Sequence, residues 1–190
     1  MHLVNDLIVF LAANLILSQA LGISTMFIAA GSRRNLVGTA CCIMVFTTVG
    51  TMAAYLIDSA LPSRLSDLRL LFYTLAIGAM YIGSLGAVYS IKRLDFAVIR
   101  KYIHLSAFNC AVMGTLFTIS DKARSDSSLM NFAEYLKFGF EAGLGFITAA
   151  LILTAAYRKL NSSKVPASFR GFPAMLVYTG IISMAVYSLK

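Results

Sequence analysis

The chain alternates between long apolar blocks and short polar interruptions, a pattern typical of a protein that crosses a membrane several times. Each block has roughly 20 residues, the length of helix that spans a hydrocarbon core about 30 Å thick. Open strands cannot satisfy their backbone hydrogen bonds in lipid, so each block is predicted to be a helix. The pattern predicts six spans, at Leu3–Ala30, Leu36–Ile57, Leu70–Ile91, Tyr102–Ile119, Phe132–Tyr157 and Phe172–Leu189.

Composition points the same way. Of the 190 residues, 59% are hydrophobic and 13% are charged, and the mean hydropathy is +0.80. A soluble domain would carry about 25% charged residues. The first block has no Lys or Arg before it and is too long for the apolar part of a signal peptide, so we interpret it as a retained span. We predict an all-α integral membrane protein that forms a single domain over residues 1–190.

The basic residues lie between the apolar blocks, and their placement predicts an orientation. The net charge is +8, but this spacing favours the positive-inside effect over nucleic-acid binding. The first, third and fifth loops hold ten Lys and Arg residues: Arg33, Arg34, Lys92, Arg93, Arg100, Lys101, Arg158, Lys159, Lys164 and Arg170. The opposite side holds five, which are Arg64, Arg69, Lys122, Arg124 and Lys190. We therefore expect cytoplasmic basic loops and both termini on the outer side.

Two of the predicted spans are interrupted. The first contains Leu21-Gly22-Ile23-Ser24-Thr25, and the fourth places Asn109 beside Cys110. If the halves of the chain, about 1–91 and 92–190, are aligned with Ser24 over Cys110, three spans face three spans. An odd number of spans makes the halves run in opposite directions, which predicts two inverted three-helix repeats whose interruptions meet near the midplane. A long, tilted first helix with small residues for close packing is the alternative.

Cys110 is the residue of greatest chemical interest, because polar groups at membrane depth need a partner, a ligand or a cavity. An unpaired buried cysteine ordinarily behaves as a small hydrophobe. Thiolates also hold iron–sulfur clusters, normally four at a time, so a cluster at Cys110 would require a partner chain. Cys41 and Cys42 lie in the second span. We interpret them as packed core residues, with the supply of a further sulfur ligand as the alternative.

Several motifs together resemble one family. Residues 108–114 read Phe-Asn-Cys-Ala-Val-Met-Gly, similar to the fourth-span motif of the Rnf/Nqr small membrane subunits. Residues 165–171 read Val-Pro-Ala-Ser-Phe-Arg-Gly, similar to the loop before the last span of the A-type members, from Rnf (Rsx) electron transport complexes. The resemblance covers essentially the whole chain, and further matches are Phe138-Gly139-Phe140, Gly145-Phe146 and Leu21-Gly22 behind Asn14.

The resemblance implies a six-span subunit of two inverted halves, paired with a homologous subunit of opposite topology (E-type). The pair would hold an intramembrane 2Fe-2S cluster, to which each chain supplies two cysteines, one from each interrupted helix. The parent complex includes flavin-carrying subunits in the inner (plasma) membrane of bacteria or archaea. It moves electrons between ferredoxin or NADH and NAD or quinone, coupled to Na+ or H+ export. By this resemblance Cys110 is an iron ligand of the shared cluster.

Ser24 departs from the family pattern, because the family's first cysteine corresponds to this position. A serine hydroxyl is a hard, weakly acidic ligand and a poor substitute for a thiolate on iron. Either the cluster is held differently, or this member lacks it. Two alternatives to an A-type subunit therefore stay open: an E-type subunit of the related NADH:quinone Na+ pump, and a cofactor-free transporter or assembly subunit of the same fold.

Glu141 is a second departure, since the family has a small residue there. A carboxylate at the bilayer centre costs about 2.5–3.5 kcal/mol. Lys137 lies one helical turn earlier, and a Lys137–Glu141 pair near the outer interface is one interpretation. The other is a cation path that includes Glu141 and Asn109. We find no nucleotide-binding glycine motif and no metal-spaced histidines, His104 being placed at a helix end, and we expect no catalysis from the chain alone.

Overall fold

The computed structural model describes residues 21–25, 33–62, 65, 68–90, 96–126, 131–163 and 165–187. Within these ranges the regular structure is helical and contains no strand. The principal helices are α4 (Arg33–Ala60), α5 (Arg69–Ser90), α6 (Phe96–Ala107), α7 (Cys110–Ser125), α8 (Phe132–Leu160) and α9 (Phe172–Tyr187). The predicted all-α class is confirmed for the described part of the chain.

Among the described residues, three helices are long and apolar enough to cross a membrane, at Asn35–Ala60, Arg69–Ser90 and Phe132–Tyr157. They correspond to the second, third and fifth predicted spans. Helices α6 and α7 add a fourth if the bent pair is counted as one span, and α9 has a shorter apolar stretch, Phe172–Ala185. The first predicted span, Leu3–Ala30, lies outside the described residues except for 21–25, so the count of six spans stays a prediction.

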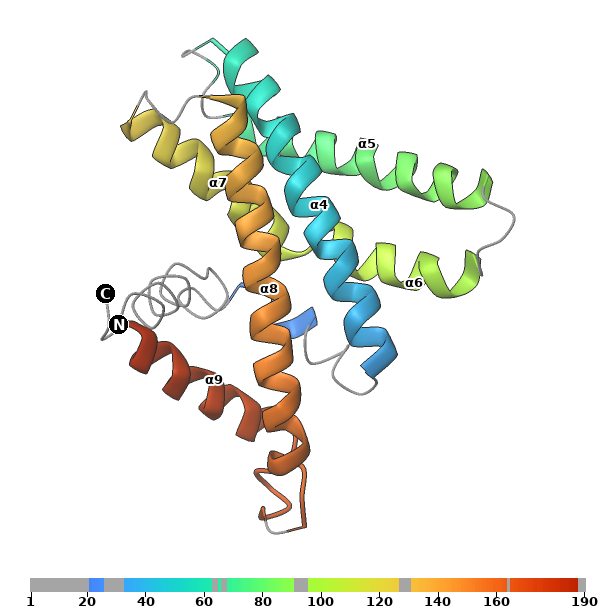
Figure 1. Cartoon of the computed structure of the whole chain (residues 1–190), viewed down its shortest axis with the longest axis vertical. Coiled ribbons are helices and arrows are strands. Elements are labelled where there is room, and N and C mark those ends of the chain that lie inside the picture. Colours follow the sequence, from blue (N-terminus) through green and yellow to red (C-terminus); the bar gives the residue numbers. More distant parts are fainter. Residues whose placement is uncertain are drawn as a thin grey trace.

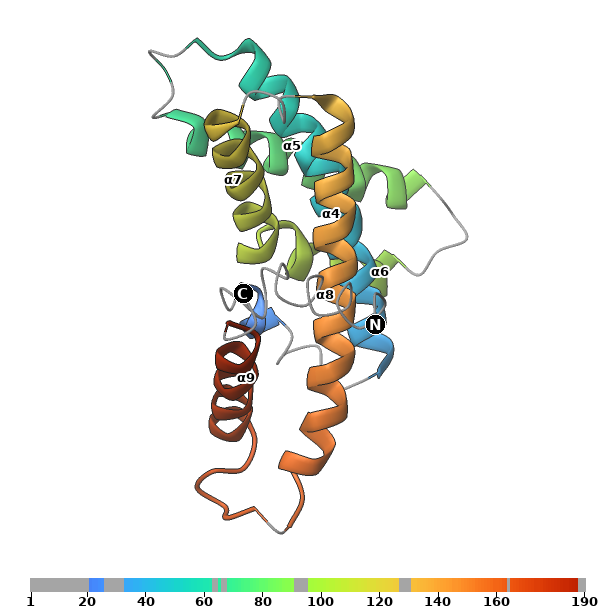
Figure 2. The ribbon, with the colours of Figure 1, turned by 60° about the vertical axis from the view of Figure 1, so that its left-hand side comes forward.

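Helices α4 and α8 pack side by side and form the centre of the molecule (Figures 1 and 2). Small residues of α8 allow this approach. A Cβ atom at Gly143 would lie 2.7 Å from Met44 Cγ and 2.9 Å from Met44 Cα, and one at Gly139 would lie 2.9 Å from the Thr47 carbonyl oxygen. The small-residue face that the sequence predicts on α8 therefore packs against the α4 backbone, as membrane helices often do.

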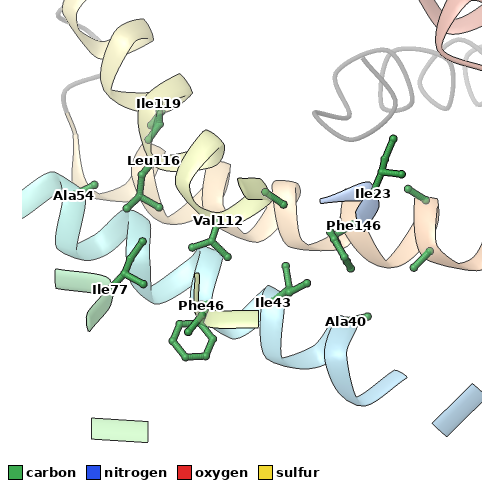
Figure 3. Close-up of a cluster of buried hydrophobic side chains, with 14 of the residues drawn as sticks. Ile23, Ala40, Ile43, Phe46, Ala54, Ile77, Val112, Leu116, Ile119 and Phe146 are labelled. Carbon is green, nitrogen blue, oxygen red and sulfur yellow. The ribbon is translucent and has the colours of Figure 1, made fainter. Parts of the chain in front are cut away.

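The remaining helices surround this pair. Helices α5 and α6 lie against α4 and project to one side, whereas α7 contacts both α4 and α8, and α9 lies beside α8 (Figure 1). The core forms where α4, α7 and α8 meet, with buried side chains that include Ile43, Phe46, Val112, Leu116 and Phe146 (Figure 3). In lipid, hydroxyls in such a core need partners inside the protein. Thr47 and Thr115 accordingly donate to backbone carbonyls of their own helices, at 2.9 and 2.7 Å.

The helices extend further than the apolar blocks indicate. Charged residues end an apolar block, but they do not end a helix if their side chains reach solvent or a partner. Arg100 and Lys101 lie inside α6 with exposed side chains, and Lys122 and Arg124 occupy the last turn of α7. There they complement the negative end of the helix dipole. Asp58, which the apolar pattern assigns to a loop, lies in the last turns of α4.

Candidate functional site at the broken helix

The fourth predicted span is interrupted at Asn109, where α6 and α7 meet at an angle of 43°. Asn109 has extended backbone angles (φ −89°, ψ 138°), and its side-chain oxygen accepts a hydrogen bond from the Ala111 N–H at 3.0 Å. An N-cap of this kind satisfies a backbone donor left unpaired at a helix start. Asn109 is 3% exposed, so its amide begins α7 at Cys110 and accounts for the predicted interruption.

The second interrupted stretch packs directly against this break. The chain turns at Leu21 and Gly22, and a helical segment begins at Ile23. Gly22 has φ +80°, a conformation that favours glycine. Its N–H donates a hydrogen bond to Cys110 Sγ at 2.9 Å, across 88 positions of sequence. Leu21–Thr25 and the α6–α7 break therefore meet, as the alignment of the two halves predicts.

Close packing at this junction leaves little room for a side chain at Gly22. A Cβ atom there would lie 3.0 Å from Ala111 Cβ, 3.0 Å from Phe146 Cε2 and 3.3 Å from Asn109 Oδ1. Ile23 is buried beside α8 (Figure 3). Both the backbone conformation and the space at position 22 require glycine, so the junction is a specific contact between the two interruptions.

The chemically active groups of this junction point outward. Cys110 and Ser24 are both exposed, whereas the neighbouring Ile23 and Thr25 are buried. The Cys110 thiol also lies 3.6 Å from Asn109 Oδ1. A backbone N–H donated to sulfur stabilises a thiolate, the form that binds metals. Asn109 Nδ2 is buried and has no hydrogen-bond partner among the described residues. The site thus presents one thiol and one hydroxyl on its outer face.

Cys41 and Cys42, which the sequence interpretation offers as alternative sulfur ligands, both lie on α4. Cys41 is exposed and Cys42 is half-buried. The described residues contain no group of three or more His, Cys, Asp or Glu side chains that could hold a metal ion. The described residues thus contain no complete metal site of this kind around Cys110, and the supply of a sulfur by Cys41 or Cys42 stays a prediction.

Glu141 lies apart from this junction, on an exposed part of α8. Its side chain and that of Lys137 are both exposed. In the described ranges an ion pair joins Arg69 to Asp58, whereas none joins Lys137 to Glu141. The Glu141 carboxylate forms no ion pair with the described residues, so it is accessible to a cation or to water.

A buried polar network that the sequence interpretation missed lies at the end of α4. Asp58 is 6% exposed. Tyr73 of α5 donates its hydroxyl to Asp58 Oδ1 at 2.6 Å, and Tyr135 of α8 donates to Oδ2 at 2.8 Å. Arg69 Nε lies 3.7 Å from Oδ1, and Arg69 Nη1 donates to Ser120 Oγ of α7 at 2.9 Å. The Asp58 carboxylate therefore links α4, α5 and α8, and Arg69 extends the network to α7.

The spacing of Asp58 from the other packed residues of α4 is the sequence signal that places it on the buried face. The buried stripe of α4 includes Ile43, Thr47, Thr51 and Ala54, and Asp58 continues it at the same three- and four-residue steps. Such steps mark one face of a helix. The apolar pattern ends at Ile57 because Asp58 is charged, although the face that α4 presents to its neighbours continues for another turn.

Comparison with known proteins identifies the family. A family model described as "Rnf-Nqr subunit, membrane protein" matches residues 6–190. The chain belongs to the Rnf-Nqr family. Several similar proteins carry the name of the A-type subunit of an ion-translocating oxidoreductase complex. That of Shewanella sediminis is 26% identical over 178 residues, covering 92% of this chain and 89% of the relative. Those of Pseudoalteromonas atlantica and Shigella boydii serotype 4 are each 25% identical, with the same coverage.

In this Rnf-Nqr protein, the side chain at position 110 suits an iron–sulfur cluster and the side chain at position 24 does not. Cys110 is exposed, and its sulfur accepts a hydrogen bond from the Gly22 N–H. Both features suit a thiolate that binds iron at an interface with another chain. Ser24 is exposed but offers oxygen, a hard ligand that suits iron–sulfur chemistry poorly. This junction therefore offers one thiol, and a shared cluster would need its other sulfur ligands from elsewhere.

Proposed function

We propose that this Rnf-Nqr protein is the A-type membrane subunit of an ion-translocating oxidoreductase complex. Family membership over residues 6–190 supports the class, and the relatives of Shewanella and Shigella carry the name of the A-type member of such a complex. Those names favour the A-type over the E-type alternative. The observation that carries the assignment to an electron path is the contact between Gly22 N and the exposed thiol of Cys110.

The proposed architecture has six spans in two inverted halves, about 1–91 and 92–190. The 43° break between α6 and α7, and its contact with the turn at Leu21–Gly22, support it. Each half would then contribute one interrupted helix to a common junction. Such junctions, built from broken helices, are where proteins of inverted repeats bring substrates or ions to the membrane interior.

The proposed electron-carrying group is a 2Fe-2S cluster shared with a homologous six-span partner of opposite topology. When bound, such a cluster accepts and donates single electrons. In this chain Cys110 would bind iron, Gly22 would hold the thiolate by its N–H, and Asn109 would fix the start of α7. Ser24 would occupy the remaining position with a hydroxyl. Because the chain offers one thiolate, the partner would have to supply more of the ligands.

The proposed surroundings follow from the family. The chain would lie in the inner (plasma) membrane of a bacterium or archaeon, with both termini outside, beside other members of the complex that include flavin-carrying ones. Electron transfer would be coupled to Na+ or H+ movement, with Glu141 and Asn109 on the ion path. The chain would have no catalytic activity by itself.

Ser24 favours a second candidate function, a cofactor-free transporter or assembly subunit of the same fold. Iron content and the EPR spectrum of the purified, reduced complex separate the two. If Cys110 binds a cluster, the complex shows a signal from a membrane-buried 2Fe-2S centre that Cys110→Ala removes. Cys41→Ala is the matched control and should keep the signal. A complex without such a signal, or one unchanged by Cys110→Ala, would exclude the electron-relay function and favour the second candidate.

A further inference from the structure

A shallow, open pocket of about 510 Å³ lies along α6. Its lining residues recur at three- and four-residue steps, so they share one face of the helix: Ala97, Arg100, Lys101, His104 and Leu105. Two basic side chains, Arg100 and Lys101, therefore lie beside apolar side chains on one face of α6. Neither the oxidoreductase assignment nor the Cys110 site uses this face.

One wall of the pocket is held in place by hydrogen bonds. Arg100 Nε donates to His104 Nε2 at 3.1 Å, and the Tyr81 hydroxyl of α5 lies 2.6 Å from His104 Nδ1. Arg nitrogens only donate, so Nε2 is the acceptor and Nδ1 carries the hydrogen that Tyr81 accepts. This chain of contacts ties α6 to α5 and orients the Arg100 guanidinium, which makes Tyr81 and His104 positioning residues.

The two cations of the pocket have no carboxylate partner among the described residues. The ion pair in those ranges joins Arg69 to Asp58, and the side chains of Arg100 and Lys101 are exposed. The Nη groups of Arg100 can donate two parallel hydrogen bonds, the geometry that suits a phosphate, and Lys101 adds a point charge. The positive charge and the hydrogen-bond donors of Arg100 and Lys101 therefore suit an anionic ligand.

The surroundings of the pocket select the kind of anion. Ala97 and Leu105 are apolar parts of its lining, and other exposed apolar or aromatic side chains of α5 and α6 include Ile82, Tyr89 and Val98. A soluble anion gains nothing from apolar contacts, whereas a phospholipid places a phosphate directly above acyl chains. Arg100 and Lys101 are on the predicted cytoplasmic side, where anionic lipids attract basic groups.

We infer that the α6 pocket binds the phosphate group of an anionic phospholipid, with Arg100 and Lys101 as its two cationic contacts. His104 and Tyr81 hold Arg100 in position, and the apolar lining takes the upper part of the acyl chains. This lipid would belong to the layer of lipids that contacts α6.

The test measures lipid retention and thermal stability of the full chain purified in mild detergent with the proteins that accompany it. Phosphatidylglycerol, phosphatidylcholine and inorganic phosphate are added separately. We expect phosphatidylglycerol alone to raise the melting midpoint by several degrees and to stay bound in native mass spectra. Arg100→Gln with Lys101→Gln should remove both effects, because the phosphate loses both contacts.

Two further variants make the result specific. Arg124→Gln with Lys159→Gln removes the same charge from exposed positions elsewhere and should keep the phosphatidylglycerol effect. Arg100→Lys with Lys101→Arg preserves the charges and should keep most of it, even if the neutral variant folds poorly. An equal effect of phosphatidylcholine, or an unchanged response in the neutral variant that remains folded, would overturn the inference. Inorganic phosphate that reproduces the whole stabilisation would also overturn it, since the ligand would then be a free anion.

Discussion

The backbone N–H of Gly22 donates a hydrogen bond to the thiol of Cys110 at 2.9 Å, although the two residues are 88 positions apart. This contact joins the two stretches at which a helix is interrupted. It also places a hydrogen-bond donor on the sulfur that we propose as an iron ligand. The geometry of the junction therefore depends on residue 22 as much as on the cysteine.

Replacement of Gly22 by alanine is expected to disturb this junction. A non-glycine residue in the left-handed region costs about 1–3 kcal/mol, and the new Cβ would lie 3.0 Å from both Ala111 Cβ and Phe146 Cε2. We expect Gly22→Ala to lower the free energy of unfolding by about this amount. Denaturant titration in detergent measures the change. Gly180→Ala is the control, because Gly180 is helical with open space around it; an equal, small effect of both variants would contradict the prediction.

The Asp58 network should make an unusually large contribution to stability for a polar group. A buried hydrogen bond to a charged group contributes about 1.5–3 kcal/mol. Tyr73→Phe and Tyr135→Phe each remove one such bond to Asp58 and should each destabilise the protein by about that amount. Tyr89→Phe is the matched control, since Tyr89 is 78% exposed. Thermal unfolding compares the three, and tyrosine variants as stable as the control would show that the network is dispensable.

Asp58→Asn should be more damaging than either tyrosine substitution. It removes the negative charge that faces Arg69 at 3.7 Å and leaves that half-buried cation uncompensated, at a cost below the about 3–5 kcal/mol of a fully buried pair. The double variant Asp58→Asn with Arg69→Gln should recover part of the loss, because no unpaired charge remains. A double variant whose destabilisation equals the sum of the single ones would rule out coupling between the two side chains.

Glu141 tests the proposed ion path. If its exposed carboxylate binds the coupled ion, Glu141→Gln should reduce ion transport by the complex several-fold and leave its iron content unchanged. Glu134→Gln is the control, since Glu134 lies in the first turn of the same helix and is expected to keep full transport. Transport by reconstituted vesicles is the measurement. Wild-type transport in Glu141→Gln would assign this residue a structural role.

The predicted orientation can be tested by labelling. A cysteine introduced at Lys92, between α5 and α6, should react with a membrane-impermeant maleimide only after the cytoplasmic side is opened. One introduced at Arg64, between α4 and α5, should react from outside. The unmodified chain, with its three native cysteines, gives the background. Reaction of the Lys92 site from outside would reverse the topology.

The sequence by itself determined the class of the protein and the positions of several helices. Apolar blocks of about 20 residues require helices in lipid, and three of the predicted spans coincide with α4, α5 and α8. The break in the fourth span was also predictable. Asn109 is a residue that caps helices, and an amide in an apolar block needs a local hydrogen bond. These features depend on neighbours within a few positions.

The tertiary structure decided which partners surround the buried polar groups, and whether Cys110 is buried or exposed. The charge of Asp58 marks the end of an apolar block, yet Tyr73 and Tyr135 from two other helices bury it. Cys110, which an apolar sequence context suggests is buried, is exposed beside Gly22. Contacts between residues tens of positions apart depend on how whole helices pack, and hydropathy along the chain carries no information about that packing. Local pattern therefore identifies the helices, whereas the surroundings of each carboxylate and thiol follow from their arrangement in space.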